Sequence, residues 1–243
     1  MPKYRILTPL AKSIQQYSAG FLHLFYPHIC MQCGSENLAA STLLCLPCEK
    51  SIPYTKFISI EKNSIEKIFW GRVPIKEAGA SLFFTKESIV QSLLFALKYK
   101  HQKKAGWLLG NIIGQEMLES HRFKTIDCMI PIPLTKKKQR KRGYNQAMLI
   151  CEGIQQKLPH IEILPILRKL KNSTSQTGKG RIERSLSISH PFTVITPHKL
   201  MSKNIVVVDD VITTGATLEA ACKCLWKESH PCSISIVATA YTL

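Results

Sequence analysis

The chain has 243 residues and 45 % of them are hydrophobic, so it can form one medium domain plus a small metal-stabilised module, with no room for a long disordered tail. Lysine and arginine number 33 against 16 acidic residues, and the formal charge of +17 favours a polyanionic partner without choosing among nucleic acid, an anionic membrane and a pyrophosphorylated metabolite. No apolar run approaches the roughly 18 residues that span a bilayer, and the first residues lack a signal-peptide pattern, which predicts a cytoplasmic protein. In that compartment nine cysteines indicate metal ligation and buried thiols rather than disulfides.

Apolar residues between positions 7 and 25 recur at steps of three and four, which is typical of an amphipathic helix. Polar residues such as Lys12 and His23 interrupt this stretch. We therefore expect a helix that docks on another part of the protein rather than one that enters a membrane.

Two C-x-x-C pairs follow this helix, and eleven residues separate them. Each pair can direct two thiolates at one centre, and two pairs complete the tetrahedron of a closed structural zinc site. The alternative is a group of four buried thiols. The predicted Zn²⁺ ligands are Cys30, Cys33, Cys45 and Cys48.

The sequence divides into a first domain over residues 1–55, which holds the helix and the cysteine module, and a second domain over residues 75–243. Residues 51–75 contain two prolines and few clear periods, and we expect them to be a connector. From residue 75 onward, strand-like and helical patterns alternate, which predicts an α/β domain with a parallel sheet flanked by helices. Strand-like segments are expected at 78–84, 126–132, 161–167, 204–208 and 233–240, and helices at 87–99, 104–119, 145–158 and 216–228.

The segment from Asn204 to Thr217 is the most informative part of the chain. Four apolar residues, typical of a strand buried on both faces, lead into the acidic pair Asp209 and Asp210. Gly215 then permits a turn that exposes backbone N–H groups at the start of a helix, where an anion binds readily. A carboxylate pair beside a phosphate suits ribose hydroxyls, so the segment predicts a ribose 5-phosphate site. The alternative, a Walker B strand, would require a G-x-x-x-x-G-K-[ST] loop, which the chain lacks.

This segment resembles the phosphoribosyl pyrophosphate (PRPP) motif of type I phosphoribosyltransferases. The resemblance implies a type I phosphoribosyltransferase fold, with PRPP and Mg²⁺ as ligands and Asp209 and Asp210 as the catalytic pair that holds the ribose 2′- and 3′-hydroxyls. The remaining PRPP contacts that it implies in the motif are Val211, Thr213, Thr214, Gly215, Ala216 and Thr217.

More widely, the chain resembles the ComF family, which joins an N-terminal zinc finger to a phosphoribosyltransferase-like domain. The matching segments are 24–27, 97–99, 131–134 and 142–146, together with Gln176, Arg181, Arg184 and Phe192. The chain departs from the family pattern at Lys179, Ser187 and Tyr144. The resemblance adds these candidate PRPP contacts: Lys98, Tyr99, Arg142, Gln176, Arg181 and Arg184.

Two basic segments are candidates for contact with the pyrophosphate. The resemblance implies a loop before the PRPP strand that closes over the pyrophosphate. Residues 169–184 have the length and polarity for this role, and Arg181 and Arg184 would face the leaving group. Residues 136–142 hold six positive charges in seven positions and are expected to form a loop that meets pyrophosphate, a nucleic-acid backbone or only solvent. Lys98, near a helix end, also has a purely structural alternative there.

The resemblance to ComF proteins implies a protein that binds PRPP and supports the uptake of single-stranded DNA in natural transformation, with single-stranded DNA and a helicase-like protein as partners. Tyr144 beside Arg142 could stack on a base. Two alternatives remain open at this point. One is a metabolic enzyme that transfers phosphoribose to a small nitrogen base, and the other is a module that senses PRPP without turnover.

Overall fold

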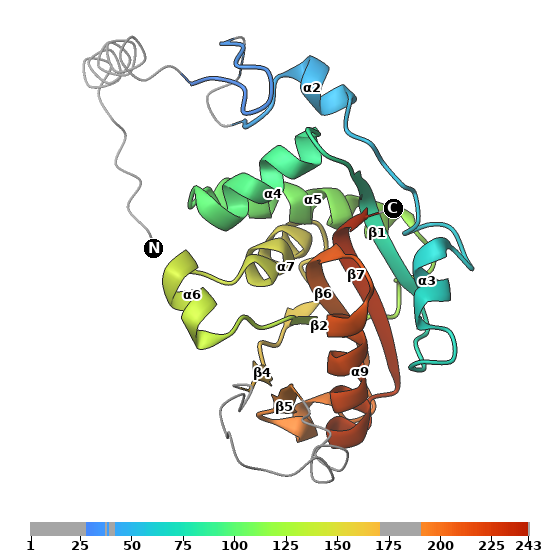
Figure 1. The fold of residues 1–243 in the computed structure, drawn as a ribbon. Helices are drawn as coiled ribbons and strands as arrows, with labels where there is room; N and C mark the ends of the chain where they lie inside the picture. Colours follow the sequence, from blue (N-terminus) through green and yellow to red (C-terminus); the bar gives the residue numbers. More distant parts are fainter. Residues whose placement is uncertain (1–27, 37, 39–41, 171–190, 243) are drawn as a thin grey trace, which may run out of the picture. The chain divides into compact units, whose positions relative to one another are not determined.

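The computed structural model describes residues 28–36, 38, 42–170 and 191–242 (Figure 1). The chain divides into two compact units, and the boundary between them in the sequence lies between Ser51 and Ile52. The expected helix between positions 7 and 25 lies outside the described residues, as does most of the expected lid. Among the residues that the structure describes, no helix is long and apolar enough to cross a membrane.

The described part of the first unit includes the short helix α2 (Leu46–Lys50), which begins directly after Cys45. A turn precedes it in the chain, where the N–H of Gly34 donates to the carbonyl of Cys30 at 2.9 Å. Gly34 adopts a φ of 74°, a backbone conformation that glycine reaches without steric cost.

The second unit is built on a sheet of five parallel strands, in the spatial order β1-β7-β6-β2-β3. The strands are β1 (Ala78–Phe84), β2 (Cys128–Pro131), β3 (Glu162–Ile163), β6 (Asn204–Ile212) and β7 (Ser233–Thr242). The central strands β6 and β7 are apolar and buried along most of their length, as a sheet covered on both faces requires.

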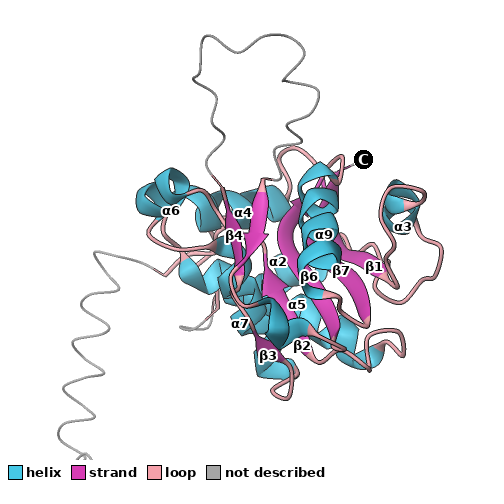
Figure 2. Ribbon diagram, turned by 90° about the horizontal axis from the view of Figure 1, so that it is seen from below, coloured by secondary structure: helices cyan, strands magenta, loops and turns pink. Residues whose placement is uncertain are grey.

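Helices cover both faces of this sheet (Figure 2). The helices α4 (Ile89–Tyr99), α5 (Lys103–Glu119) and α7 (Gln146–Lys157) pack on one face, and α3 (Ser64–Phe69) and α9 (Ala216–Ser229) contribute to the core on the other. Helices α5 and α7 approach closely because Gly110 and Gly153 face each other. A Cβ at Gly110 would lie 2.1 Å from the carbonyl oxygen of Ile150.

The expected parallel-sheet domain is therefore confirmed, and its helices begin and end within a few residues of their predicted positions. The structure also places α3 inside the segment that was expected to be a connector. Ile58, Ile65 and Phe69 of this segment are fully buried, and Asn63 caps α3 by accepting from the N–H groups of Ile65 and Glu66.

Three local expectations were wrong. The strand expected at 161–167 is divided into β3 and β4 (Leu167–Lys169), because Pro165 has no N–H to offer a ladder; β4 pairs instead with β5 (Phe192–Val194) as an antiparallel ribbon. The strand expected at 204–208 continues to Ile212, because pairing with β7 extends through Asp209, Val211 and Ile212.

The third correction concerns the basic run, which forms helix α6 (Lys136–Arg142) rather than a loop. Lysine and arginine are good helix formers. Thr135 accepts from the N–H of Lys138 at the start of the helix, and Gly143 ends it with a φ of 75°. Three cations in the last turn lie where the helix dipole favours positive charge.

Candidate functional site

The acidic pair lies in the carboxyl-terminal half of β6, at the edge of the sheet where parallel α/β folds bind ligands. The N–H of Asp210 donates to Oδ1 of Asp209 at 2.8 Å. Successive side chains of a strand point to opposite faces of the sheet, so the two carboxylates have different neighbours. Asp209 lines a hollow with the residues that follow it, and Asp210 meets helix α4.

Lys98, in the last turn of α4, forms an ion pair with Asp210 in which Nζ lies 2.8 Å from Oδ2. The side chains are 23 % and 18 % exposed, so the pair is only partly screened by water. Lys98, for which the sequence left a site role and a purely structural role open, therefore contacts the acidic pair.

Burial, with the charge of Asp210 as a second cause, raises the pKa of Asp209 to about 7. Lys98 and Lys169 oppose this shift. Near neutral pH the Asp209 carboxyl is therefore divided between its ionised and protonated forms. A hydroxyl group of a ligand can donate to the first form and accept from the second.

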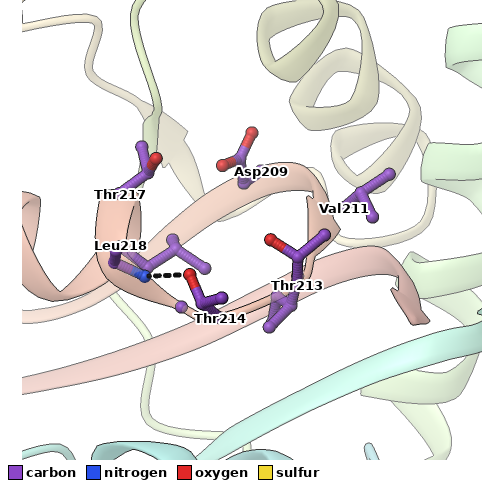
Figure 3. A pocket seen from close by; sticks show the side chains of 9 residues that line it. Asp209, Val211, Thr213, Thr214, Thr217 and Leu218 are labelled. Atoms are coloured by element: carbon purple, nitrogen blue, oxygen red, sulfur yellow. Dashed lines mark hydrogen bonds between the residues drawn. The ribbon is translucent and has the colours of Figure 1, made fainter. Parts of the chain in front are cut away.

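The hollow beside Asp209 is lined by the loop between β6 and α9 and by the first turn of α9 (Figure 3). It has an empty volume of about 230 Å³ and is lined by Asp209, Val211, Ile212, Thr213, Thr214, Gly215, Ala216, Thr217 and Leu218. The amides at the start of a helix of this length are suited to bind an anion, and the hydroxyls of Thr213 and Thr217 add donors. Thr214 accepts from the N–H of Ala216 at 3.5 Å.

Gly215 is the residue whose backbone makes this loop possible. It caps α9 with a φ of 72°. A Cβ at this position would also lie 2.9 Å from Cγ2 of Ile68 and 3.1 Å from the ring of Phe69. Helix α3 therefore packs against the loop and leaves no room for a side chain at position 215.

Arg72 connects the same loop to its neighbours, and no sequence pattern indicates this contact. Its Nη1 donates to the carbonyls of Ile68 at 3.1 Å and Thr214 at 3.2 Å, and its Nη2 pairs with Glu219 of α9. The pKa of Glu219 is lowered by its contact with Lys223 and by Arg72. Arg72 comes from the segment expected to be a connector, so only the contact across more than a hundred residues of chain identifies it.

Two further predicted PRPP contacts, Tyr99 and Arg142, lie against each other. Tyr99 is 57 % exposed, and the guanidinium carbon of Arg142 lies 5.6 Å from the centroid of its ring. Arg142 also donates to Oε1 of Gln146 at 3.0 Å. The structure therefore brings Tyr99 and Arg142 to each other. Gln176, Arg181 and Arg184 lie outside the described residues.

The four predicted zinc ligands form one cluster in the first unit. All four Sγ atoms lie within 4.8 Å of one another, and those of Cys33 and Cys45 are 3.6 Å apart. Tetrahedral zinc with Zn–S bonds of about 2.3 Å holds its sulfurs about 3.8 Å apart, so these distances fit. The N–H of Cys45 also points at Sγ of Cys30, at 3.4 Å, as a donor to a thiolate would. The cluster can hold a metal ion such as zinc.

Comparison with known proteins adds independent support for the fold. The family described as "Phosphoribosyl transferase domain" matches residues 157–242, which include β6, the loop and α9. A hypoxanthine phosphoribosyltransferase structure from Staphylococcus aureus aligns with 58 % of this chain and 74 % of its own, at 14 % identity and a TM-score of 0.35. The second unit is a phosphoribosyltransferase-type domain.

Similarity to individual proteins is more informative about function than the match to the domain family. Competence protein F of Haemophilus influenzae is 24 % identical over 213 residues, which cover 84 % of this chain and 93 % of that protein. Competence protein ComFC of Bacillus subtilis is 36 % identical over 44 % of this chain and 41 % of its own length, and DNA utilization protein YhgH of Escherichia coli O157:H7 is 26 % identical over 52 % and 56 %. With the four-cysteine cluster in front of the phosphoribosyltransferase domain, these similarities support the resemblance of the chain to ComF-type proteins.

Proposed function

We propose that this protein binds PRPP together with Mg²⁺ at the carboxyl end of β6 and supports the uptake of DNA in the cytoplasm, where it contacts single strands. The observation that carries the PRPP site is the acidic pair followed at once by an anion-binding helix start. DNA uptake follows from the names of the relatives, two of which are competence proteins and one a DNA utilization protein.

Each part of PRPP has a partner in this arrangement. The 5-phosphate binds the amides at the start of α9, where the helix dipole and the hydroxyls of Thr213 and Thr217 favour an anion. The ribose hydroxyls donate to the carboxylates of Asp209 and Asp210. Because these groups lie on one strand and the loop that follows it, the ligand is held by a rigid part of the domain.

Mg²⁺ fits this site because carboxylates and phosphate oxygens are the hard donors that it prefers. Lys98 pairs with only one of the two adjacent acids, so negative charge remains for a cation. When bound with PRPP, it would neutralise charge on the departing pyrophosphate. Lys98 adds a cation at the same place, and it also holds Asp210 in position. These groups suit transfer of the pentosyl group, because that reaction develops charge and needs no protein nucleophile.

The cysteine cluster holds Zn²⁺ in a structural role in this proposal. Four thiolates fill the tetrahedron, so no coordination position is left for substrate. Metal release by a chelator should unfold the first unit, since structural zinc contributes directly to folding.

Calorimetric titration with PRPP and Mg²⁺ tests the proposed site. Wild-type protein should show saturable binding, and the double variant Asp209→Asn/Asp210→Asn should lose it. Asp127→Asn is the matched control, because this carboxylate lies at the opposite end of the same part of the sheet, where Oδ2 accepts from the N–H of Asn204 at 2.7 Å. Equal binding by wild type and the double variant would show that PRPP does not bind here.

Turnover is tested separately by pyrophosphate release. Release in the presence of one nitrogen base would indicate a metabolic phosphoribosyltransferase, and PRPP binding without release would indicate a binding role. Salt-dependent binding of single-stranded DNA supports the role in DNA uptake.

A further inference from the structure

A surface where the end of α4 meets the end of α6 combines exposed aromatic rings with cations. We call it the aromatic–cationic surface and define it by Phe95, Tyr99, Tyr144, Lys100, Lys103 and Arg142. Phe95 and Tyr99 are one helical turn apart on α4, and they are 50 % and 57 % exposed. Their ring centroids are 5.1 Å apart, so they present one continuous aromatic area to solvent.

Each ring of this surface lies beside a cation. Nζ of Lys100 is 5.8 Å from the centroid of Phe95, the guanidinium carbon of Arg142 is 5.6 Å from that of Tyr99, and Nζ of Lys103 is 5.9 Å from that of Tyr144. A planar, apolar face with a positive charge next to it is suited to a nucleobase that carries its own phosphate.

The third ring is held in place by the backbone. Tyr144 Oη donates to the carbonyl of Leu97 at 2.6 Å, and its ring meets His101 edge-on at a centroid distance of 6.2 Å. Gly143, which ends α6, provides the turn that brings Tyr144 back to α4. A ring ordered before binding loses little conformational entropy when a base stacks on it.

The two stretches of sequence that meet at these rings carry charge of one sign. No acidic residue occurs from Ser88 to Gln115 or from Cys128 to Cys151, the two stretches of sequence that meet here. The first stretch has four lysines, and the second has the six cations of α6. Cations alone would suit any polyanion, including a pyrophosphate or a lipid head group, but neither of these has a flat π-face for the exposed rings of Phe95 and Tyr99 and the half-buried ring of Tyr144.

We propose that the aromatic–cationic surface is the binding surface for single-stranded DNA, with bases on Phe95 and Tyr99 and phosphates on the cations of α4 and α6. This inference rests on the DNA-binding part of the proposed function and assigns it a place. Duplex DNA hides its base faces in the stack, so the surface selects single strands. Because Lys98 pairs with Asp210 while the next residue, Tyr99, belongs to the surface, a bound strand would lie beside the proposed PRPP site.

Fluorescence anisotropy with a short labelled oligothymidylate and the full-length, zinc-loaded protein tests this surface. Phe95→Ala should weaken binding by about five- to a hundredfold, the range for one stacked base. Phe95→Leu keeps the apolar bulk but not the ring and should weaken binding to a similar degree. Trp70→Ala is the matched control, because Trp70 is an aromatic side chain of similar exposure (56 %) beside α3.

The salt dependence separates stacking from charge. Lys100→Gln should make the slope of log affinity against log salt shallower by about 0.7, the value for one phosphate contact on a single strand. Phe95→Ala removes no charge and should leave the slope unchanged.

The outcomes distinguish the two levels of the proposal. If wild-type protein binds the oligonucleotide and Phe95→Ala and Phe95→Leu bind it as tightly, DNA binds elsewhere and the surface assignment is wrong. Equal losses in Trp70→Ala and Phe95→Ala also overturn it. If folded wild-type protein binds no single-stranded DNA, the DNA-binding part of the proposed function fails, whatever the variants do. Binding of PRPP, measured in the same samples, reports on the first site alone.

Discussion

Two groups of one cation and two carboxylates occur in the second unit, and they are organised in different ways. In the first, Arg122 pairs with both Glu66 and Glu77, and its Nη1 also donates to the carbonyls of Phe57, Ile58 and Ile60. The arginine side chain is only 7 % exposed. Burial raises the pKa of Glu77, and the charge of Arg122 opposes that shift.

In the second group, Lys98 pairs with Asp210, while Asp209 faces the hollow and has its pKa raised to about 7. An ammonium group is a compact charge, whereas a guanidinium can serve two carboxylates at once. The Arg122 group therefore satisfies its charges internally and joins three parts of the chain. The Lys98 group retains a carboxyl whose pKa is raised and which is only partly ionised near neutral pH, and such a group is typical of a binding site.

Loss of the buried arginine should have the largest effect. Arg122→Met leaves two carboxylates buried without their partner, and we expect the free energy of unfolding to fall by about 3–5 kcal/mol. Denaturant titration measures it, and Lys98→Met, which breaks a more exposed pair, should cost less than about 1 kcal/mol. Similar losses in the two variants would remove the distinction between the groups.

Asp209→Asn should stabilise the protein while it abolishes PRPP binding. The pKa of Asp209 is about 7 in the folded state and 3.8 in its ordinary, unfolded-state range. Between about pH 4 and pH 7 the folded protein therefore binds more protons than the unfolded protein, and wild-type stability falls as the pH rises through this range. Asparagine cannot ionise, and its amide oxygen can still accept from the N–H of Asp210. The shift of about three pKa units sets an upper limit of about 4 kcal/mol on this gain at pH 8, and we expect the gain to vanish below about pH 4. A loss of stability at pH 8 would contradict the assignment.

Lys98→Met should weaken PRPP binding about tenfold, equivalent to about 1.4 kcal/mol, because it removes a cation from the pyrophosphate side and releases Asp210. Calorimetry at pH 8 measures this change. Lys98→Arg keeps the charge and should recover most of the affinity. If Lys98→Met binds PRPP as wild type does, the ion pair of Lys98 with Asp210 stabilises the fold and takes no part in PRPP binding.

Arg72→Ala should have the smallest effect on stability and still be visible in binding. The side chains of Arg72 and Glu219 are 38 % and 18 % exposed, so water screens the pair in part and the free energy of unfolding should change by about 1 kcal/mol or less. The carbonyl of Thr214 loses its donor, and we expect PRPP affinity to fall about threefold as the loop loosens. Arg72→Lys, which cannot reach both partners in the same way, should resemble the alanine variant.

The parallel sheet and the phosphate-type loop could be predicted because their signals are local. Apolar runs define β6 and β7, and Gly215 between threonines and a helical pattern defines the turn. The acidic pair and the four cysteines were visible for the same reason. Each of these features occupies a few consecutive residues or a short fixed spacing.

The rest depends on contacts between distant segments. Residues 52–75 show no clear hydrophobic periodicity because their buried side chains do not follow one face of a helix. Neither α3 nor the role of Arg72 could therefore be predicted. Helix α6 was mistaken for a loop because its surface pattern is uniform and only its caps define it. The aromatic–cationic surface appears only when α4 and α6 are brought together.

The position of β7 determines the order in which this sheet can be completed. β7 lies between β1 and β6, and among the described strands it is the partner of β1 in the sheet. It is also the last of the five to leave the ribosome. During synthesis β1 must therefore wait without its neighbour while more than a hundred residues emerge, with an unpaired edge that is open to other chains. Association of the nascent chain with a chaperone would protect this edge until β7 inserts.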